Sequence, residues 1–150
     1  MKRRLVIIIA CTLAMGLTLA GLALATAGSG LVSVEYGRHT VSQFSAKFTD
    51  RDIVVSELSF APGGYSGWHS HPGKVIVAVA RGSLTIYHSD GSTCIPTTYS
   101  AGDLFVERGG VAHYAVNEGT VAAVINVTYL RVPIGGSPRI DEAQPAGCNI

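Results

Sequence analysis

The sequence has few charged residues and few aromatic ones, and neither kind is concentrated in one region. Charged side chains make up 14% of the 150 residues and aromatic side chains 7%. Three basic residues, Lys2, Arg3 and Arg4, stand near the N-terminus; removing these three from the 11 basic residues leaves 8 against 10 acidic ones, a formal charge of −2. Without a basic patch or a stripe of interleaved aromatics, the composition argues against nucleic-acid binding.

Long helical patterns are also missing after residue 27, where no amphipathic stretch of ten or more residues is found. Short alternating or β-branched stretches follow one another instead, separated by turns that contain glycine. We predict strands at 52–60, 74–80, 83–89, 93–100, 104–108, 112–117 and 121–132, with Arg81–Gly82 as the turn of a tight hairpin. Many short strands with glycine at nearly every corner predict an all-β sandwich or barrel.

The one long hydrophobic run lies at the N-terminus, directly after the basic residues. Ala25 and Ala27 fit the A-x-A pattern of a signal-peptide cleavage site. At about 20 residues, the apolar stretch is also long enough to span a bilayer as a helix. We therefore expect residues 1–27 to form either a signal peptide or an uncleaved membrane-anchor helix. Both place the rest of the chain outside the cytoplasm.

Cysteine is scarce, with three residues in the chain. Cys11 belongs to the N-terminal segment, which leaves Cys94 and Cys148 in a compartment that permits disulfides. We expect a Cys94–Cys148 disulfide that pins a coil-like C-terminal tail at 134–150; two free buried thiols are the alternative. Neither cysteine has the spacing from histidine that a zinc knuckle requires.

Three histidines stand out from this apolar background. His69 and His71 are one residue apart at the start of a predicted strand, so both imidazoles point to one face. His113 begins another alternating strand. Three imidazoles that converge from two strands of a small barrel form a plausible facial metal site with open positions.

The residues around these histidines resemble the two sequence motifs of the cupin family. The first motif, G(x)5HxH(x)3–4E(x)6G, is matched by Gly63, His69, His71 and Gly82. The second, G(x)5PxG(x)2H(x)3N, is matched by Gly102, Gly110, His113 and Asn117, with Arg108 in place of the proline. The resemblance covers about residues 52–133. It implies a double-stranded β-helix, which is a small jelly-roll barrel, with the three histidines as metal ligands.

One departure from the first motif concerns the metal. Val75 stands where the family has its glutamate ligand, and its parity with His71 places it on the same interior face. Glu107 is a conceivable replacement, but its period-two partners are Phe105 and Asp103, and we expect a surface charge there. Three histidines alone leave the full double charge on a divalent ion, which favours Fe, Cu, Ni or Zn over the harder Mg or Mn.

Four further residues are expected behind the ligands or around the pocket: Val75, Asn117, Phe105 and Trp68. For Trp68 and Phe105, simple packing in the barrel is the alternative. Asn117 is expected to make a structural hydrogen bond or one that supports a ligand, since a buried amide needs partners. His39 and His88 lie outside the motifs and are expected on the surface.

The expected organisation is one domain: a strand or wrap at 28–48, the barrel at 49–133 and the tail at 134–150. Two functions stay open. One is a metal-dependent enzyme, an oxidoreductase of the dioxygenase type or an isomerase, acting on a small molecule. The other is a non-enzymatic domain, binding a small ligand or structural, with a degenerate metal site. Membrane contact is expected only through an uncleaved N-terminal segment, and an edge strand within 31–48 is suited to pairing two barrels as a homodimer.

Overall fold

The computed structural model describes residues 26–41 and 50–150, and within these ranges the chain consists of strands and their connections. The ten strands are β1 (Ser29–Val41), β2 (Arg51–Tyr65), β3 (His69–Ser70), β4 (Val75–Arg81), β5 (Ser83–Ser89), β6 (Cys94–Ser100), β7 (Leu104–Glu107), β8 (His113–Val116), β9 (Ala123–Val132) and β10 (Ile140–Asp141). The all-β prediction is confirmed. Residues 1–25, which carry most of the predicted signal or anchor helix, lie outside the described residues. In the described part of the chain, no helix is long and apolar enough to cross a membrane.

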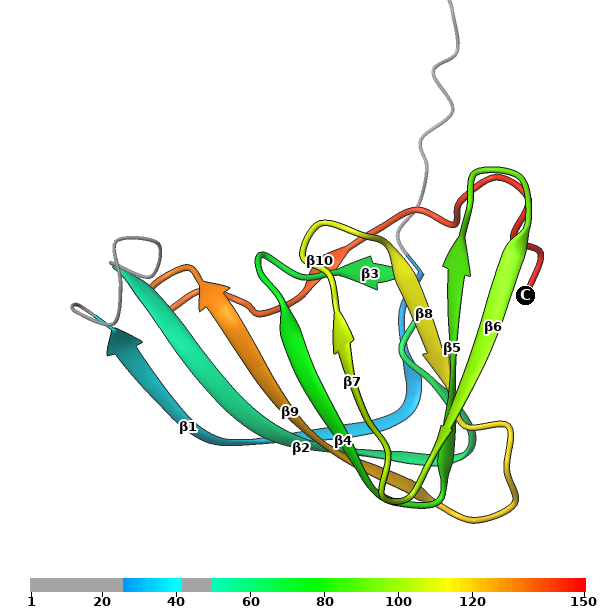
Figure 1. Cartoon of the computed structure of the whole chain (residues 1–150), viewed down its shortest axis with the longest axis horizontal. Helices are drawn as coiled ribbons and strands as arrows, with labels where there is room; N and C mark the ends of the chain where they lie inside the picture. Colours follow the sequence, from blue (N-terminus) through cyan, green and yellow to red (C-terminus); the bar gives the residue numbers. More distant parts are fainter. Residues whose placement is uncertain (1–25, 42–49) are drawn as a thin grey trace, which may run out of the picture.

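The strands form two antiparallel groups that face each other in a nearly closed barrel (Figure 1). One group has the order β1-β2-β9-β4-β7, and the other contains β6, β5, β8, β3 and β10. The long strand β2 joins them, because its last residue, Tyr65, pairs with Val116 of β8. This arrangement is the jelly-roll barrel that the motifs imply.

Alternation along the strands places the core between the two groups. In β4, Val75, Val77 and Val79 are buried while Ile76 is exposed on the outer face. Strand β9 lies between β2 and β4 and buries Ile125 and Val127 in the same way. β-Branched residues suit such a pleated, half-buried surface. The core is therefore made by the period-two pattern seen in the sequence.

The predicted hairpin at Arg81–Gly82 is wrong. Strand β4 pairs with β7 and β9, whereas β5 pairs with β6 and β8, so the two strands flanking Gly82 belong to opposite groups. Gly82 has a φ of 71°, and a Cβ there would lie 2.8 Å from the carbonyl oxygen of Ala122. Glycine at this position turns the chain through a barrel corner instead of folding it back on itself.

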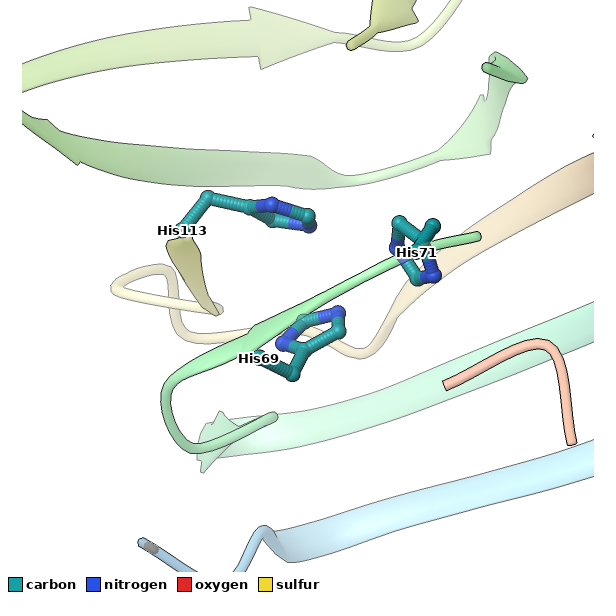
Figure 2. A group of neighbouring side chains, drawn as sticks. All are labelled: His69, His71 and His113. Atoms are coloured by element: carbon teal, nitrogen blue, oxygen red, sulfur yellow. The ribbon is translucent and has the colours of Figure 1, made fainter. Parts of the chain in front are cut away.

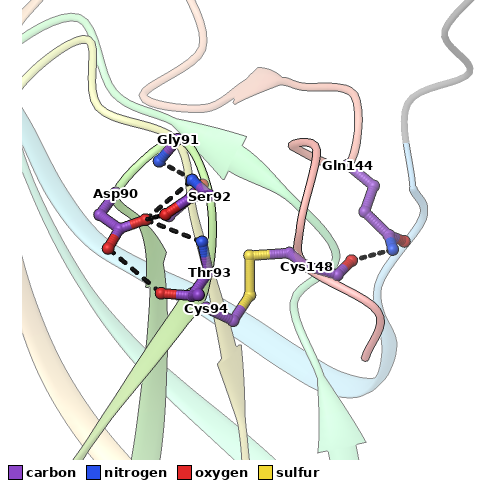
Figure 3. The surroundings of a disulfide bond; sticks show 8 residues. Asp90, Gly91, Ser92, Thr93, Cys94, Gln144 and Cys148 are labelled. Atoms are coloured by element: carbon purple, nitrogen blue, oxygen red, sulfur yellow. Dashed lines mark hydrogen bonds between the residues drawn. A yellow bond between two sulfur atoms is a disulfide. The ribbon is translucent and has the colours of Figure 1, made fainter.

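The hairpin lies one step later, between β5 and β6, where Ser83 pairs with Ser100 and Ser89 with Cys94. The Asp90 carboxylate closes its tip by accepting hydrogen bonds from the backbone N–H groups of Ser92 and Thr93, both at 2.8 Å (Figure 3). Cys94, at the start of β6, forms a disulfide with Cys148. The hairpin tip is thereby tied to the end of the chain.

The C-terminal tail crosses the barrel beside the short strand β3. Ile140 and Asp141 of β10 pair with Ser70 and His69. Glu142 accepts a hydrogen bond from the Ser70 hydroxyl at 2.6 Å. The tail, expected as coil held by Cys148, thus also contributes a two-residue strand, and it lies directly against the His-x-His segment.

A buried carboxylate joins the edge strand β1 to the turn after β9. Asp52 is 1% exposed and accepts hydrogen bonds from the Gly135 N–H at 2.9 Å, the Thr40 hydroxyl at 2.7 Å and the Arg38 guanidinium at 3.0 Å. These three donors, in that order of importance, hold the pKa of Asp52 below its usual range.

Candidate metal centre

The three histidines of the two motifs lie together inside the barrel. His69 belongs to β3 and pairs across the ladder with His113 at the start of β8, while His71 follows β3 directly. All three are buried, and one nitrogen from each ring lies within 4.8 Å of the others. Figure 2 shows the three rings turned toward a common point. The structure thus brings together the residues that the sequence singled out.

The far side of each ring is held by the backbone. The Nδ1 atoms of His69, His71 and His113 are bonded to the carbonyl oxygens of Gly67 at 2.9 Å, Pro138 at 2.7 Å and Val111 at 3.0 Å. A carbonyl oxygen only accepts, so each Nδ1 carries a proton and donates. In the neutral ring, Nε2 then presents a lone pair, which is the usual arrangement of a metal-binding histidine.

The Nε2 atom of His113 is buried and has no hydrogen-bond partner among the described residues. A buried polar atom without a partner costs free energy unless a ligand compensates for it. Three imidazole nitrogens oriented by backbone carbonyls are a donor set that suits Zn, Cu, Fe or Ni. The residues present therefore fit a divalent transition metal.

Glu107 is not the surface charge that we expected. Its side chain is buried, with 8% of the residue exposed. Its Oε2 lies 3.3 Å from Nε2 of His71, and its Oε1 lies 3.4 Å from Nε2 of His113. The expectation failed because Asp103, used as a period-two partner, precedes β7, whose first residue is Leu104. Within the strand, Glu107 shares its inward parity with the partly buried Phe105.

Val75 has the orientation that its parity predicts. It is 1% exposed and lies on β4 between two neighbours on the same rung, Glu107 of β7 and Tyr129 of β9. The position of the family's glutamate is thus occupied by a small apolar side chain, and the residue beside it on the adjacent strand is a carboxylate.

The titration of the site reflects this crowding. Burial, followed by the positive charges of His113, His71 and Arg139, lowers the pKa of His69 to about 2, which keeps that ring neutral. Burial also lowers the pKa of His113, but the Glu107 carboxylate outweighs it, and the net shift is upward. For Glu107, burial raises the pKa, while His113 and His71 together lower it well below its usual range.

A cavity of about 200 Å³ opens beside the histidines. Its polar lining includes His69, His71, Glu107 and Arg139. Apolar barrel side chains, among them Leu58, Phe60, Val77 and Val127, form its wall. Arg139 comes from the C-terminal tail, and its Nε is held by Asp141 Oδ1 at 2.6 Å. The sequence pattern did not single out this arginine, whose only indirect signal was Cys148, the residue that ties the tail back to the barrel.

The remaining predicted residues support the barrel and do not line this cavity. Trp68 is buried and tilted against the ring of Tyr114 at 5.8 Å, and Phe105 stacks on Tyr99 at 3.9 Å. Asn117 is fully buried, and its Nδ2 donates to the carbonyl oxygens of Phe60 at 3.0 Å and Val121 at 2.8 Å, which are backbone groups of the barrel.

His88 differs from the surface residue that we expected. It is only partly exposed, and its ring centroid lies 5.8 Å from that of His113, its partner in the β5–β8 ladder. Because the ladder register decides this position, the missing motif context did not reveal it. The side chain of His39 lies outside the described part of the structure.

The sequence matches the family described as "Cupin domain" over residues 56–129. It is 31% identical over 67 residues to the beta-alanine degradation protein BauB of Pseudomonas aeruginosa, which covers 44% of this chain and 68% of that protein. The chain belongs to the cupin family. The histidines that converge in this cupin are those of the two family motifs.

Other similarities of this cupin are more partial. It is 34% identical over 84 residues to germin-like protein 5-1 of Oryza sativa subsp. japonica, which covers 54% of this chain. It spans only 38% and 34% of the lengths of the two germin-like relatives that it matches. The structure of oxalate oxidase in complex with the substrate analogue glycolate is 26% identical, with a TM-score of 0.52 over 67% of this chain and 50% of that one.

The fold is also found in a protein of Klebsiella pneumoniae subsp. pneumoniae described as having a double-stranded beta-helix domain. The TM-score is 0.58 at 18% identity, over 81% of this chain and 92% of that one. This likeness concerns the fold alone.

Proposed function

We propose that this chain is an exported cupin that binds a divalent transition metal through His69, His71 and His113 and takes a small carboxylate into the adjoining cavity. The observation that carries the proposal is the orientation of the three rings. Each Nδ1 is held by a backbone carbonyl, and His113 Nε2 has no hydrogen-bond partner within the described residues. Such an arrangement is built for a cation and not for packing alone.

The metal is expected to be Fe, Cu, Ni or Zn, and when bound it supplies a Lewis acid for an oxygen atom of the ligand. The protein's own part is positioning. The carbonyl oxygens of Gly67, Pro138 and Val111 fix the rings, and apolar barrel side chains line the cavity beside them.

The carboxylate class is supported by the cavity and by the relatives. A volume of about 200 Å³ suits a molecule of a few heavy atoms, and Arg139 is the cation that lines it. A guanidinium recognises a carboxylate through paired hydrogen bonds, and Asp141 holds this one by its Nε edge. Oxalate oxidase binds glycolate, and BauB is named for the degradation of beta-alanine, so small carboxylates recur among the similar proteins.

Export is supported by two features. A Cys94–Cys148 disulfide is formed, and disulfides persist in oxidising compartments. The N-terminal residues also have the sequence pattern of a signal peptide or anchor.

The test begins with the metal content of purified protein and with reconstitution using Fe, Cu, Ni and Zn salts. We expect about one equivalent of metal, and its loss in His71→Ala with the fold retained. Loaded protein should then bind oxalate or glycolate in calorimetry. Arg139→Gln should weaken that binding while the metal content is unchanged.

Two outcomes would refute the proposal. A wild-type protein that takes up no metal from any of these salts has a degenerate site. Equal binding of oxalate by the metal-free and loaded proteins would assign the ligand to a non-enzymatic pocket that needs no metal. Oxygen uptake by the loaded protein with either acid separates an oxidase from a binding protein.

A further inference from the structure

We propose that Glu107 is the carboxylate ligand of the metal and that it supplies from β7 the group that the first motif lacks at Val75 on β4. The site is then made of His69, His71, His113 and Glu107. This inference rests on the proposed metal-binding function and specifies the ligand set.

The distances from Glu107 to two of the histidines match those between ligands of one ion. Donors that lie about 2.0–2.2 Å from a metal are separated from one another by roughly 3–3.5 Å in octahedral or tetrahedral geometry. The two Glu107 oxygens lie 3.3 Å from His71 Nε2 and 3.4 Å from His113 Nε2. The carboxylate already has ligand spacing to two histidines whose Nδ1 atoms are occupied elsewhere.

The strand register explains how this position substitutes for the missing one. Val75 and Glu107 are directly paired in the antiparallel ladder of β4 and β7. Side chains on such a pair emerge on the same face with Cβ atoms about 4.5–5.5 Å apart. A carboxylate on either strand therefore reaches the same part of the interior. The small side chain of Val75 leaves room for that of Glu107.

The burial of Glu107 calls for a cation. A neutral histidine that donates from Nδ1 presents a lone pair at Nε2, and two such lone pairs next to a carboxylate repel it. A buried carboxylate is tolerated when a cation is held beside it. A divalent metal held by the same histidines would supply that cation.

The additional carboxylate changes which metals the site accepts. Three histidines alone leave two positive charges on the ion, whereas Glu107 neutralises one of them. Oxygen ligands also suit harder ions, so we expect this four-ligand site to bind Mn²⁺ as well as Fe²⁺. Measurable Mn²⁺ affinity is therefore the property that distinguishes this ligand set from the three-histidine set.

The experiment compares wild type, Glu107→Gln, and the exchange variant Val75→Glu/Glu107→Val. Glu118→Gln is the matched control, because Glu118 is an exposed carboxylate that bonds to Thr85 and Tyr87. Mn²⁺ and Zn²⁺ dissociation constants are measured by competition with a chelating dye. The d–d absorption of bound Co²⁺ reports the coordination number, and circular dichroism checks the fold.

We expect Glu107→Gln to weaken Mn²⁺ binding by about 100-fold or more. Mutating a residue that only hydrogen-bonds to a metal ligand lowers metal affinity by about 10- to 100-fold, and loss of a ligand itself should cost at least the upper value. Zn²⁺ affinity should fall less, because Zn²⁺ binds well to imidazole, and the Co²⁺ spectrum should change. The exchange variant should recover both Mn²⁺ affinity and the spectrum, since its carboxylate lies on the same rung. Glu118→Gln should match wild type.

Wild-type Mn²⁺ affinity and an unchanged Co²⁺ spectrum in Glu107→Gln would overturn the assignment of Glu107 while leaving the three-histidine site intact. An exchange variant that is folded but does not recover Mn²⁺ binding would contradict the shared-rung explanation. A wild-type protein that binds neither these ions nor Fe, Cu or Ni overturns this inference and the proposed function together, so the two failures are distinguishable.

Discussion

His71 donates a hydrogen bond from Nδ1 to the carbonyl oxygen of Pro138 at 2.7 Å. The acceptor belongs to the C-terminal tail, so a segment that follows the whole barrel orients a candidate metal ligand. The same tail supplies Arg139 to the cavity and ends near Cys148, which is bonded to Cys94. The tail is therefore part of the site.

Removing the disulfide should lower stability and loosen the tail. The bond closes a loop of 54 residues, for which the chain-entropy model gives about 4 kcal/mol. We expect Cys94→Ala/Cys148→Ala to reduce the free energy of unfolding by 2–4 kcal/mol, a common range for such bonds. Denaturant titration measures it. A reducing agent should destabilise the wild type by a similar amount and leave the stability of the double variant unchanged. Equal free energies of unfolding for the two proteins without reducing agent would contradict the prediction.

Metal binding should stabilise the fold, because the ligands come from β3, β8 and the segment after β3. At a free metal concentration about 100 times the dissociation constant, the gain is about 2.7 kcal/mol. This corresponds to an increase in Tm of roughly 10 °C for a domain of this size. Differential scanning calorimetry with and without a chelator measures the shift. His71→Ala should show none, and an equal shift in that variant would place the stabilising ion elsewhere.

Asp52 should make stability depend on acid pH. Its pKa is lowered by the Gly135 N–H, Thr40 and Arg38, so the folded state favours the charged carboxylate. Such a group contributes stability that is fully present above the unfolded-state pKa of about 4 and is lost as the pH falls through the lower folded-state pKa. In Asp52→Asn, the free energy of unfolding should fall less between pH 5 and pH 2 than in wild type. Parallel pH curves for the two proteins would exclude this role.

Asn117 should matter for stability and not for metal content. Its amide donates to Phe60 and Val121, and its Oδ1 accepts from the Gly119 N–H at 3.0 Å. Removing these contacts leaves buried backbone groups unpaired, and we expect Asn117→Ala to cost about 2–4 kcal/mol. Asn117→Asp should also destabilise, because its carboxylate faces two carbonyl oxygens. Elemental analysis of the folded fraction should still give the wild-type metal content; loss of metal there would show that Asn117 supports the ligands.

The sequence predicted the parts of the site that are local along the chain. His69 and His71 reveal themselves by their spacing, and His113 by its place in a second short motif. Glu107 was misjudged because its neighbour on β4 is set by strand register, which a single sequence does not display. Arg139 and Pro138 were missed for a related reason, since the path of the tail is a tertiary property. The barrel corner at Gly82 was predicted to be a hairpin turn because a corner and a hairpin turn both favour glycine, which readily adopts a positive φ.

Residues in a sheet have two coordinates, the strand that carries them and the rung on which they lie. Val75 and Glu107 share a rung and differ only in strand. A functional group can therefore move far along the gene while staying almost in place in the barrel. A sequence motif that specifies a ligand at one position of one strand does not detect the same group when a neighbouring strand supplies it. In a cupin chain whose first motif lacks its glutamate, the carboxylate should therefore be sought on the neighbouring strand, at the same rung.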